Sequence, residues 1–504
     1  MLKFEYLKKL AVILSLSLSV VFWSTSCKKD KFITDPAAKL EFSQDSVLFD
    51  TVFTSAGSTT RNIRVRNKHN QKIKISSIYL QNGSSSPFIL NVDGSPGKSF
   101  SDIEIAANDS MYIFIQVFVN PLNSSSPLII NDAIVFQVNG STQNLNLEAW
   151  GQDAYYHKPK NAIKFSSGGY LPYSTVADHP TTGASITNTI VTWPNDKPHV
   201  IYGWLVVDST QQLIIQQNTK VHFHQNAGLW VYRYGTIKVN GTLNNEVVFQ
   251  GDRLEPYMQD IPGQWDRIWI NEGSVNNEIN YAIIKNGFIG VQAELLSPYL
   301  SEPRRLRITN TKIHNMKKWG LYAVAFKIYG GNNVISNCKE YCVALTVGGN
   351  YRFIHSTFAN FWTKDARSTP AVHIDNHAGA QQISLDTCYF GNCIIDGNQS
   401  NELELDIVTT NTFATNYVFS YSFLKTTNNT SNATHFTGNI VNGTSSFNDA
   451  ASYKFDLNSN SGARNLPNNP TTTADAALFP FDLKSTLRSP AADSQPDAGA
   501  YEYP

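Results

Sequence analysis

The segments AIIKN (282–286), TKIHN (311–315), NVISN (333–337), STFAN (356–360) and CYFGN (388–392) share one pattern. Each segment ends in an asparagine, and the residue two positions before that asparagine is Ile or Phe. Because side chains alternate between the two faces of a strand, the constant apolar residue marks a buried face, which the asparagine shares. The pattern therefore predicts a row of strands with asparagines stacked at their ends.

The predicted structural ladder consists of Asn286, Asn315, Asn337, Asn360 and Asn392. Successive members are 29, 22, 23 and 32 residues apart, by subtraction of their numbers. Intervals of 22 and 23 residues are typical of a solenoid in which each repeat adds one coil. The two longer intervals predict insertions near residues 295–305 and 363–382, and insertions in a solenoid form loops on one edge.

The residue types favour strands over helices, because Ile, Val, Phe and Tyr recur and no leucine-rich consensus is present. The coils resemble the right-handed parallel β-helix of the pectate-lyase-like superfamily, in which asparagine ladders recur. This resemblance covers roughly residues 161–504 and implies an all-β solenoid. The run from Ser489 to Glu502 resembles the closing motif of bacterial surface β-helices, and Tyr501 is expected to cover the last coil.

Residues 1–27 have the features of an export signal. Three lysines precede an apolar run over residues 10–23, which is too short for a comfortable membrane span. Three small residues then lead into Cys27, and this arrangement resembles a bacterial lipoprotein signal. The resemblance implies a lipidated (palmitate-bearing) Cys27 and, because Lys28 follows it, location in the outer membrane on either its periplasmic or its external face. A plain secretory signal or a buried apolar helix is the alternative.

Residues 39–152 alternate apolar and polar side chains in about seven short strands, which predicts an immunoglobulin-like β-sandwich. The run from Phe49 to Asn67 resembles Hydin-type domains, which implies a spacer or an interaction module. The predicted organisation is a signal (1–27), a tether (28–38), the sandwich (39–152), a linker (153–161), the β-helix (162–485) and the closing motif (486–504).

Composition narrows the partners. The formal net charge is +0 and charged residues make up 16% of the chain, so no attraction to nucleic acid is expected. The only expected membrane contact is the lipid on Cys27. No cofactor motif is present, and a polysaccharide or a surface protein remains as the expected partner.

Four cysteines besides Cys27 test the register. Cys338 and Cys393 each follow a ladder asparagine, and on that alignment they lie two coils apart, beyond disulfide reach. Cys342 aligns with Gly320 of the previous coil, which indicates a packed position. A zinc site at Cys338 and Cys342 lacks a second pair of ligands, so no metal is expected. A disulfide involving Cys388 stays open.

The strongest candidates for catalysis lie in the second insertion. They are Asp365, Arg367, His373, Asp375 and His377. The last three are two residues apart, so an extended backbone would place them on one face, where a base could stand beside a carboxylate. Arg367 could bind the carboxylate of an acidic sugar. The alternative is a solvated polar loop, and the paired aspartates and Arg-x-Lys element of polygalacturonase-like β-helices are absent.

Two other sets could contact a ligand. Glu402, Glu404 and Asp406 share an alternating face, as paired carboxylates for hydrolysis would. Trp319, Tyr322 and Trp362 could stack on sugar rings from the outside of the solenoid, although many aromatics will be core residues. The leading hypothesis is a lipid-anchored protein that binds a glycan or a surface partner without catalysis. The alternative is a polysaccharide lyase or glycoside hydrolase.

Overall fold

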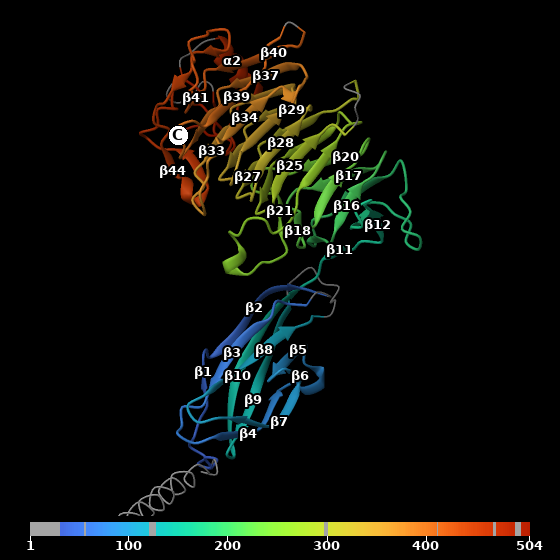
Figure 1. The fold of residues 1–504 in the computed structure, drawn as a ribbon, viewed down its shortest axis with the longest axis vertical. Coiled ribbons are helices and arrows are strands. Elements are labelled where there is room, and N and C mark those ends of the chain that lie inside the picture. Colours follow the sequence, from blue (N-terminus) through green and yellow to red (C-terminus); the bar gives the residue numbers. More distant parts are fainter. Residues whose placement is uncertain are drawn as a thin grey trace, which may run out of the picture. The chain divides into compact units, whose positions relative to one another are not determined.

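The computed structural model describes residues 31–54, 57–119, 128–296, 301–410, 412–466, 470–488 and 495–503. The chain divides into two compact units, Met1–Asp153 and Ala154–Pro504. Nearly all regular structure is β (Figure 1). Among the described residues, no helix is long and apolar enough to cross a membrane.

Unit 1 is an immunoglobulin-like β-sandwich of two five-stranded sheets. One sheet contains β1 (Glu41–Phe42), β3 (Arg61–Arg66), β8 (Ser110–Val117), β5 (Phe88–Val92) and β6 (Ser95–Gly97). The other contains β2 (Ser46–Phe53), β10 (Ser141–Gln152), β9 (Leu128–Val138), β4 (Ile73–Leu80) and β7 (Ser99–Ile105), and η1 spans Gly83–Ser85. Alternate residues of the strands, such as Ile63 and Val65, are fully buried between the sheets. The predicted sandwich is confirmed.

Unit 2 is a parallel β-helix in which the chain visits three long sheets in turn (Figure 1). Sheet 1 has eleven strands: β11 (Tyr155–His157), β15 (His199–Ile201), β18 (Lys220–Phe223), β21 (Val247–Gly251), β24 (Ala282–Lys285), β27 (Lys312–His314), β30 (Val334–Ser336), β33 (Thr357–Asn360), β38 (Ile394–Gly397), β41 (Phe423–Leu424) and β43 (Ile440–Val441). Residues 155–157, expected in a linker, thus form the first strand of this sheet.

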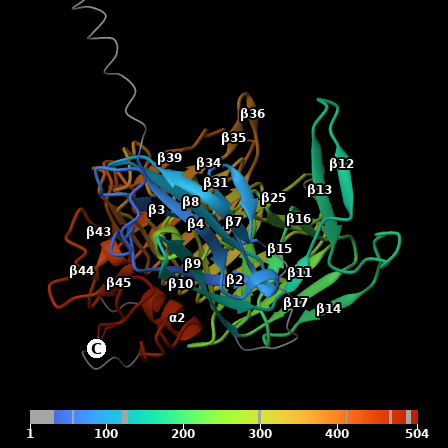
Figure 2. The same ribbon diagram turned by 90° about the horizontal axis from the view of Figure 1, so that it is seen from below.

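Sheet 2 has ten strands: β12 (Asn161–Lys164), β13 (Tyr170–Thr175), β16 (Trp204–Val207), β19 (Gly228–Val231), β22 (Ile268–Asn271), β25 (Ile289–Glu294), β28 (Trp319–Val324), β31 (Val343–Thr346), β34 (Val372–Asp375) and β39 (Leu403–Asp406). Sheet 3 has ten strands: β14 (Ile190–Trp193), β17 (Gln212–Gln216), β20 (Thr236–Asn240), β23 (Asn277–Asn280), β26 (Leu306–Thr309), β29 (Lys327–Gly331), β32 (Gly349–Ile354), β37 (Leu385–Gly391), β40 (Thr415–Ser420) and β42 (Phe436–Thr437). Only β12 and β13 pair antiparallel in these two sheets, and they project as a hairpin (Figure 2).

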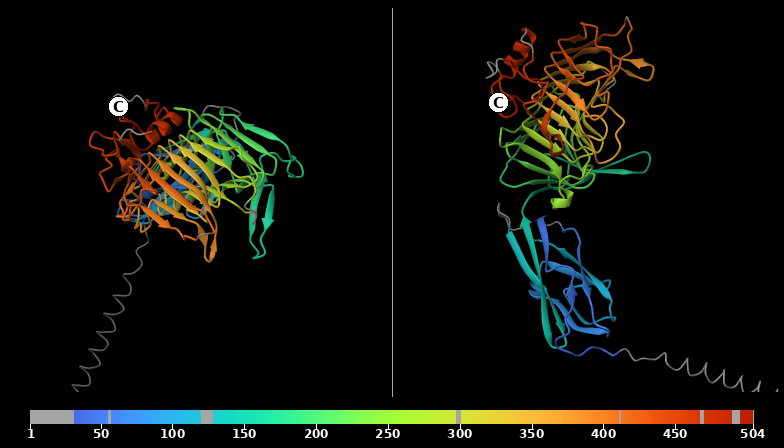
Figure 3. Two further views of the ribbon diagram at one scale, coloured as in Figure 1. Left: turned by 90° about the horizontal axis from the view of Figure 1, so that it is seen from above. Right: turned by 90° about the vertical axis from the view of Figure 1, so that its left-hand side faces the viewer.

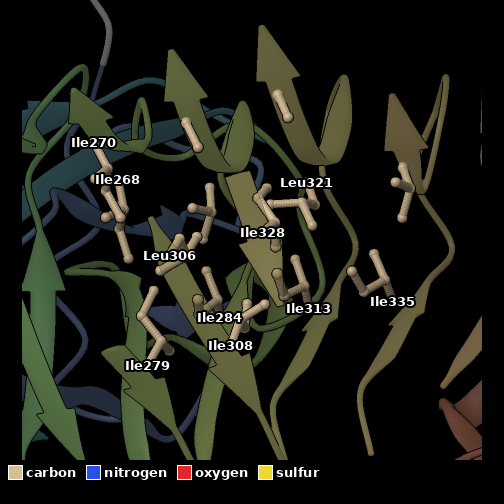
Figure 4. Close-up of a cluster of buried hydrophobic side chains, with 14 of the residues drawn as sticks. Ile268, Ile270, Ile279, Ile284, Leu306, Ile308, Ile313, Leu321, Ile328 and Ile335 are labelled. Carbon is tan, nitrogen blue, oxygen red and sulfur yellow. The ribbon is translucent and has the colours of Figure 1, made fainter. Parts of the chain in front are cut away.

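The core of unit 2 is the space enclosed by the three sheets. Ile284, Ile313 and Ile335 stack in register on successive strands of sheet 1 and are fully buried (Figure 4). Ile308 and Leu321 reach the same interior from sheets 3 and 2. Every coil therefore buries apolar side chains against those of its neighbours, which is the reason for the regular apolar position in the sequence. The predicted all-β solenoid is confirmed.

Four ladder asparagines lie in register at the ends of sheet 1 strands, because Ile284, Ile313, Ile335 and Phe358 pair in sequence. The amide of Asn315 donates to Oδ1 of Asn286 at 2.7 Å. Asn337 instead accepts from the amide of Phe361 at 2.9 Å, and Asn360 donates to the carbonyl of Glu340 at 2.8 Å. The ladder is thus a column of buried amides that bond partly to one another and partly to the backbone of adjoining loops.

The prediction that Asn392 belongs to this ladder is wrong. The register pairs Asn360 with Gly397, so Asn392 lies one corner earlier, after β37 of sheet 3. There its side chain contacts His355 Nε2 at 3.3 Å. At the same corner of an earlier coil, Asn332 donates to Asn310 at 3.1 Å. The corner after sheet 3 and the corner after sheet 1 each use a residue with left-handed backbone, with φ +52° at Asn392 and +58° at Asn315. Asparagine tolerates this conformation, so the same local sequence pattern arises at both corners.

The prediction that Cys338 and Cys393 occupy equivalent positions two coils apart is wrong. Cys338 follows a strand of sheet 1, whereas Cys393 lies just before β38, so the two thiols occupy different corners. Cys342 aligns with Gly320, since Leu321 pairs with Val343. Cys338, Cys342, Cys388 and Cys393 are all buried free thiols. Burial raises the pKa of the Cys388 thiol, so the neutral form is stabilised.

The described parts of the C-terminal segment, residues 447–466, 470–488 and 495–503, run along the side of unit 2 (red in Figure 3). It includes β44 (Phe447–Asp449), η3 (Ala450–Ser452), β45 (Lys454–Leu457) and α2 (Pro470–Leu478). Tyr501 packs against Val334 and Ala359 on the outer face of sheet 1. It therefore covers the middle of that sheet, and the expectation that it covers the last coil is wrong. Asp475 of α2 bonds Arg352 and Tyr389, which belong to sheet 3.

This segment binds three successive coils. The guanidinium of Arg488 donates to Asn332 Oδ1 at 3.0 Å and is paired with the buried carboxylate of Glu502. The amide of Ala500 donates to Thr357 Oγ1 at 3.0 Å, and that of Gly499 to the carbonyl of Asn392 at 2.7 Å. The segment thus covers part of the outer faces of sheets 1 and 3, while Arg307 and Arg352 of sheet 3 and the outward side chains of sheet 2 stay partly exposed.

Candidate functional site

The predicted second insertion is two loops with a regular strand between them. β34 belongs to sheet 2, and the extra residues lie before it, at 361–371, and after it, at 376–384. The second loop carries the hairpin of β35 (His377–Ala378) and β36 (Gln381–Gln382) (Figure 2). Val372 and Ile374 are fully buried in the core. By strand alternation, the side chains of His373 and Asp375 therefore face outward.

His373 is held between two carboxylates on this outer face. Its Nε2 lies 3.0 Å from Oδ2 of Asp375, and its Nδ1 lies 2.8 Å from Oε2 of Glu404 on β39. Burial alone would lower the pKa of His373, but the two hydrogen bonds with these carboxylates outweigh it and raise the pKa above its ordinary value. Only the imidazolium can donate from both ring nitrogens, so the geometry favours the charged form.

Tyr341 adjoins His373, and a second histidine–carboxylate pair lies next to Asp375. The Tyr341 ring lies 5.1 Å from the imidazole, and burial, together with the charges of Glu404 and other carboxylates, raises the pKa of its hydroxyl to about 12. Oδ1 of Asp375 accepts from the amide of Val347 at 2.7 Å. His377 Nε2 lies 3.2 Å from Asp406 Oδ2, without hydrogen-bond geometry. His373, Asp375, Glu404, Tyr341 and the His377–Asp406 pair form what we call the histidine–carboxylate cluster.

Arg367 does not belong to this cluster, and its predicted role toward an acidic sugar is wrong. Its guanidinium is buried and donates to both oxygens of Glu402, at 2.9 and 2.6 Å, and to the carbonyl of Asn360 at 2.7 Å. With side-chain exposures of 1% and 0%, Arg367 and Glu402 hold the loop before β34 against the solenoid. Because this ion pair consumes both partners, neither can meet a ligand.

Asp365 is also separate from His373. It lies in the loop before β34, where Lys339 Nζ is 2.7 Å from its Oδ2 and Trp362 Nε1 donates to its Oδ1 at 2.8 Å. Trp362 is only 4% exposed. The prediction that Trp362 offers a ring to a ligand is therefore wrong, since its indole packs against the body of the protein and points its N–H at Asp365.

Trp319 and Tyr322 do reach the outer face of sheet 2. Both are half-buried, and their ring centroids are 4.2 Å apart at an angle of 49°. The indole N–H of Trp319 donates to Glu340 at 2.7 Å, and the ammonium of Lys318 lies 3.9 Å from the indole centroid. By register, Tyr322 pairs with Ala344, and Ala344 pairs with His373. Tyr322 and the histidine thus lie in one outward row, and Trp319 packs against Tyr322 beside it.

The row continues in the opposite direction through residues that sequence reasoning did not connect with it. Trp230 and Trp269 stack with centroids 4.7 Å apart at 12°. Trp230 donates to Asn271 at 2.6 Å, and Trp269 donates to Glu294 at 3.0 Å. The signal that could have connected these residues is the strand register, which links Trp230, Trp269, Gln292, Tyr322, Ala344, His373 and Glu404 in order. That register depends on loop lengths that the repeat spacing did not supply.

In the described part of the chain, no group of three or more His, Cys, Asp or Glu side chains is placed to hold a metal ion. The residues of the cluster are instead paired with one another. What the row offers is an outward strip of partly exposed rings, carboxylates and one charged imidazole. Such a strip can stack on apolar faces of a ligand and hydrogen-bond to its hydroxyl groups.

The sheets place the chain in the class of all-β proteins, with a β-sandwich followed by a parallel β-helix. No protein-family model matches it, and no curated protein matches it. Among solved structures it is similar to PapD-like domain 7 of human CEP192, with 11% identity and a TM-score of 0.17 over 25% of this chain and 95% of that one. It is also similar to the E. coli chaperone DraB, with 9% identity and a TM-score of 0.16 over 22% and 54%. Likenesses at these TM-scores indicate neither function nor ligand.

Proposed function

We propose that this protein binds a glycan along the outer face of sheet 2. The observation that carries the proposal is the outward row from Trp230 to Glu404, which combines three aromatic rings with an amide, an imidazole and a carboxylate. Aromatic faces stack on the apolar faces of sugars, and amides and carboxylates bond to sugar hydroxyls. The row crosses seven strands from β19 to β39, so six spacings of about 4.8 Å give about 29 Å. A strip of that length suits a polymer better than a single sugar.

Retention on immobilised polysaccharides tests the proposal. A Trp319→Ala, Tyr322→Ala double variant is expected to lose about tenfold or more in affinity, since two stacking rings contribute roughly 1–3 kcal/mol. The matched control is Tyr112→Ala, Phe114→Ala, which removes an exposed pair of rings from unit 1 with centroids 6.5 Å apart. Equal loss in both variants, or retention unaffected by the first, would contradict binding at sheet 2.

A second function, polysaccharide cleavage by a lyase or glycoside hydrolase, is favoured by one observation, the imidazole held between Asp375 and Glu404. A charged His373 is a proton donor, and Glu404, with 45% of its side chain exposed, remains open to a ligand. This arrangement suits general acid catalysis better than proton abstraction, which needs a free base. The same experiment, followed for reducing or unsaturated ends, distinguishes the two functions. Product that disappears in His373→Ala, Asp375→Ala would identify an enzyme.

The location of the protein is part of the proposal. Cys27 lies outside the described residues, and the lipoprotein-like signal that ends at it supports lipid anchoring in the outer membrane. The finer resemblances, to Hydin-type domains for unit 1 and to the pectate-lyase-like superfamily for unit 2, support a spacer that carries a glycan-binding solenoid. Labelling cells with a palmitate analogue tests this. Wild-type protein is expected to take up the label, and Cys27→Ala is not; label retained by the variant would contradict the anchor.

A further inference from the structure

A cavity of about 310 Å³ lies on unit 2 away from the outer face of sheet 2. It lies beside the C-terminal ends of β21 and β24 in sheet 1, under the loop of residues 252–264 with its short helix η2 (Pro256–Met258). Its lining includes Gln250, Arg253, Gln264, Lys285 and Asn286. Most of these side chains end in an amide or a cation, so the cavity is polar on the sheet side and on the loop side.

The charges around the cavity do not balance. Arg253 is paired with Glu255 at 3.0 Å, and Lys364 is paired with Asp260 at 2.5 Å. Lys285 is different, because its ammonium makes no hydrogen bond or ion pair with any residue that the structure describes. A half-buried ammonium without a carboxylate is costly, since it has lost part of its hydration without gaining a partner.

The neighbours of Lys285 do not relieve this cost. Strand register places Gln250 and His314 on either side of it in the outward row of sheet 1. Burial lowers the pKa of His314 to about 3, so the imidazole is neutral and offers no opposite charge. Burial also lowers the pKa of Lys285 itself, against the influence of Asp260. An anion in the cavity would supply the missing partner. The amide of Gln250, which bonds to no residue in the part of the chain that the structure describes, could donate to it.

We propose that this cavity binds a small hydroxylated carboxylate, such as a uronic acid residue, with Lys285 as the counter-charge. The volume is at the lower end of the range for ligand pockets and exceeds what a bare ion needs. The amide of Gln250 suits a hydroxyl group, whereas the amide nitrogens of Gln264 and Asn286 already donate to carbonyls of the loop over the cavity. An ammonium recognises charge rather than a planar fork. The site lies on a different sheet from the proposed glycan strip and stands independently of it.

Calorimetric titration of residues 31–504 with sodium galacturonate tests this assignment. Galactose is the uncharged control sugar, and sodium sulfate is the control anion without a sugar ring. Galacturonate is expected to bind and galactose is not. Affinity should fall as sodium chloride is added, because salt screens the single charge pair. A Lys285→Met variant is expected to lose about tenfold or more in affinity, the scale of a charged hydrogen bond.

The matched control is Lys327→Met, which removes an exposed lysine from β29 on sheet 3. Lys285→Met removes an unpaired, half-buried charge, so its thermal unfolding midpoint is expected to equal or exceed that of the wild type. The variant should therefore be folded in the titration. If that variant unfolds, Gln250→Leu provides a second test with the charge retained. Equal affinity for galactose, binding of sulfate alone, no binding of any probe, or full affinity in Lys285→Met would each overturn the proposal.

Discussion

The contacts of His373 predict the direction in which the pKa of its imidazole is shifted. Its contacts with Asp375 and Glu404 raise its pKa above the ordinary value, so an NMR titration of histidine-labelled protein should show a pKa above about 6.5. Asp375→Asn and Glu404→Gln are each expected to lower that pKa, because each removes one negative acceptor. An unshifted pKa in the wild-type protein would contradict the hydrogen-bonded arrangement.

Stability should follow the same titration. Because the pKa of His373 is higher in the folded chain than in the unfolded one, the stabilisation that it brings is fully present below about pH 6.5. It is lost as the pH rises through the folded-state pKa. The difference in free energy of unfolding between wild type and His373→Gln is therefore expected to shrink above pH 6.5, measured by urea unfolding at several pH values. A difference that grows with pH would reverse the sign and refute the assignment.

Arg367 and Glu402 form a buried pair, so removing one partner leaves an uncompensated charge. Arg367→Met is expected to lower the free energy of unfolding by about 3–5 kcal/mol, measured by urea denaturation. Arg307→Gln is the control, because Arg307 is 49% exposed and lies 3.5 Å from Glu278. That exposed pair is expected to contribute about 0–1 kcal/mol. Similar effects of the two substitutions would show that the buried pair contributes no more than a surface one.

At the scale of single residues, strand alternation was enough to predict that His373 and Asp375 share a face. It could not predict that Glu404 is the second partner of His373, because Glu404 is 31 positions further along the chain and the segment between them includes loops of unknown path. Nor could it separate Arg367 from the cluster. The sequence pattern of a charged loop residue is the same whether its side chain is solvated or buried against a carboxylate.

At the scale of elements, Gly320 tests how closely neighbouring coils pack. A Cβ on Gly320 would lie 2.4 Å from Ile335 Cγ2 and 2.5 Å from the carbonyl oxygen of Cys342. Gly320→Ala is therefore expected to destabilise unit 2 by about 1–3 kcal/mol, measured by thermal or urea unfolding. Gly169→Ala is the control, since its Cβ would meet only Phe165 at 3.5 Å, an ordinary contact. A neutral Gly320→Ala would mean that the two coils can move apart.

The asparagine corner combines an amide bond with a backbone conformation, and two substitutions separate them. Asn315 has φ +58° and donates to Asn286. Asn315→Gly keeps the backbone and loses the amide, at a cost of about 1–3 kcal/mol for the unpaired Asn286 oxygen. Asn315→Ala is expected to cost about 1–2 kcal/mol more, because alanine resists the left-handed region. Equal unfolding midpoints for the two variants would show that the backbone conformation adds nothing.

The ladder also shows how far a repeat can be read from sequence. Asn286, Asn315, Asn337 and Asn360 end equivalent strands because an apolar residue precedes each by two positions and the coils between them carry the register. Asn392 satisfies the same local rule at a different corner. Local chemistry specifies that a turn needs a left-handed asparagine, but it does not specify which of the three sheets has just ended.

At the scale of the whole molecule, the two units provide a test of where binding resides. Residues 154–504 form a compact unit with its own core, so this fragment is expected to fold alone and to keep both the polysaccharide retention and the galacturonate binding. Calorimetry of residues 31–504 should show one unfolding transition more than the fragment does. Loss of retention in a folded fragment would place part of the glycan site in unit 1.

The C-terminal segment that bonds Asn332, Thr357 and Asn392 changes how unit 2 comes apart and how it is assembled. A stack of coils with only nearest-neighbour contacts can fray from its end, one coil at a time. In unit 2 the C-terminal segment acts as a strap, because it also bonds to coils before the last ones. The last coils cannot unfold without releasing this strap, so unfolding over that region is expected to be cooperative. The strap follows in sequence the coils that it ties, so those coils are synthesised before it. During synthesis those coils therefore have only their nearest-neighbour contacts at first, and the added stability arises once the strap has been made and has bound them.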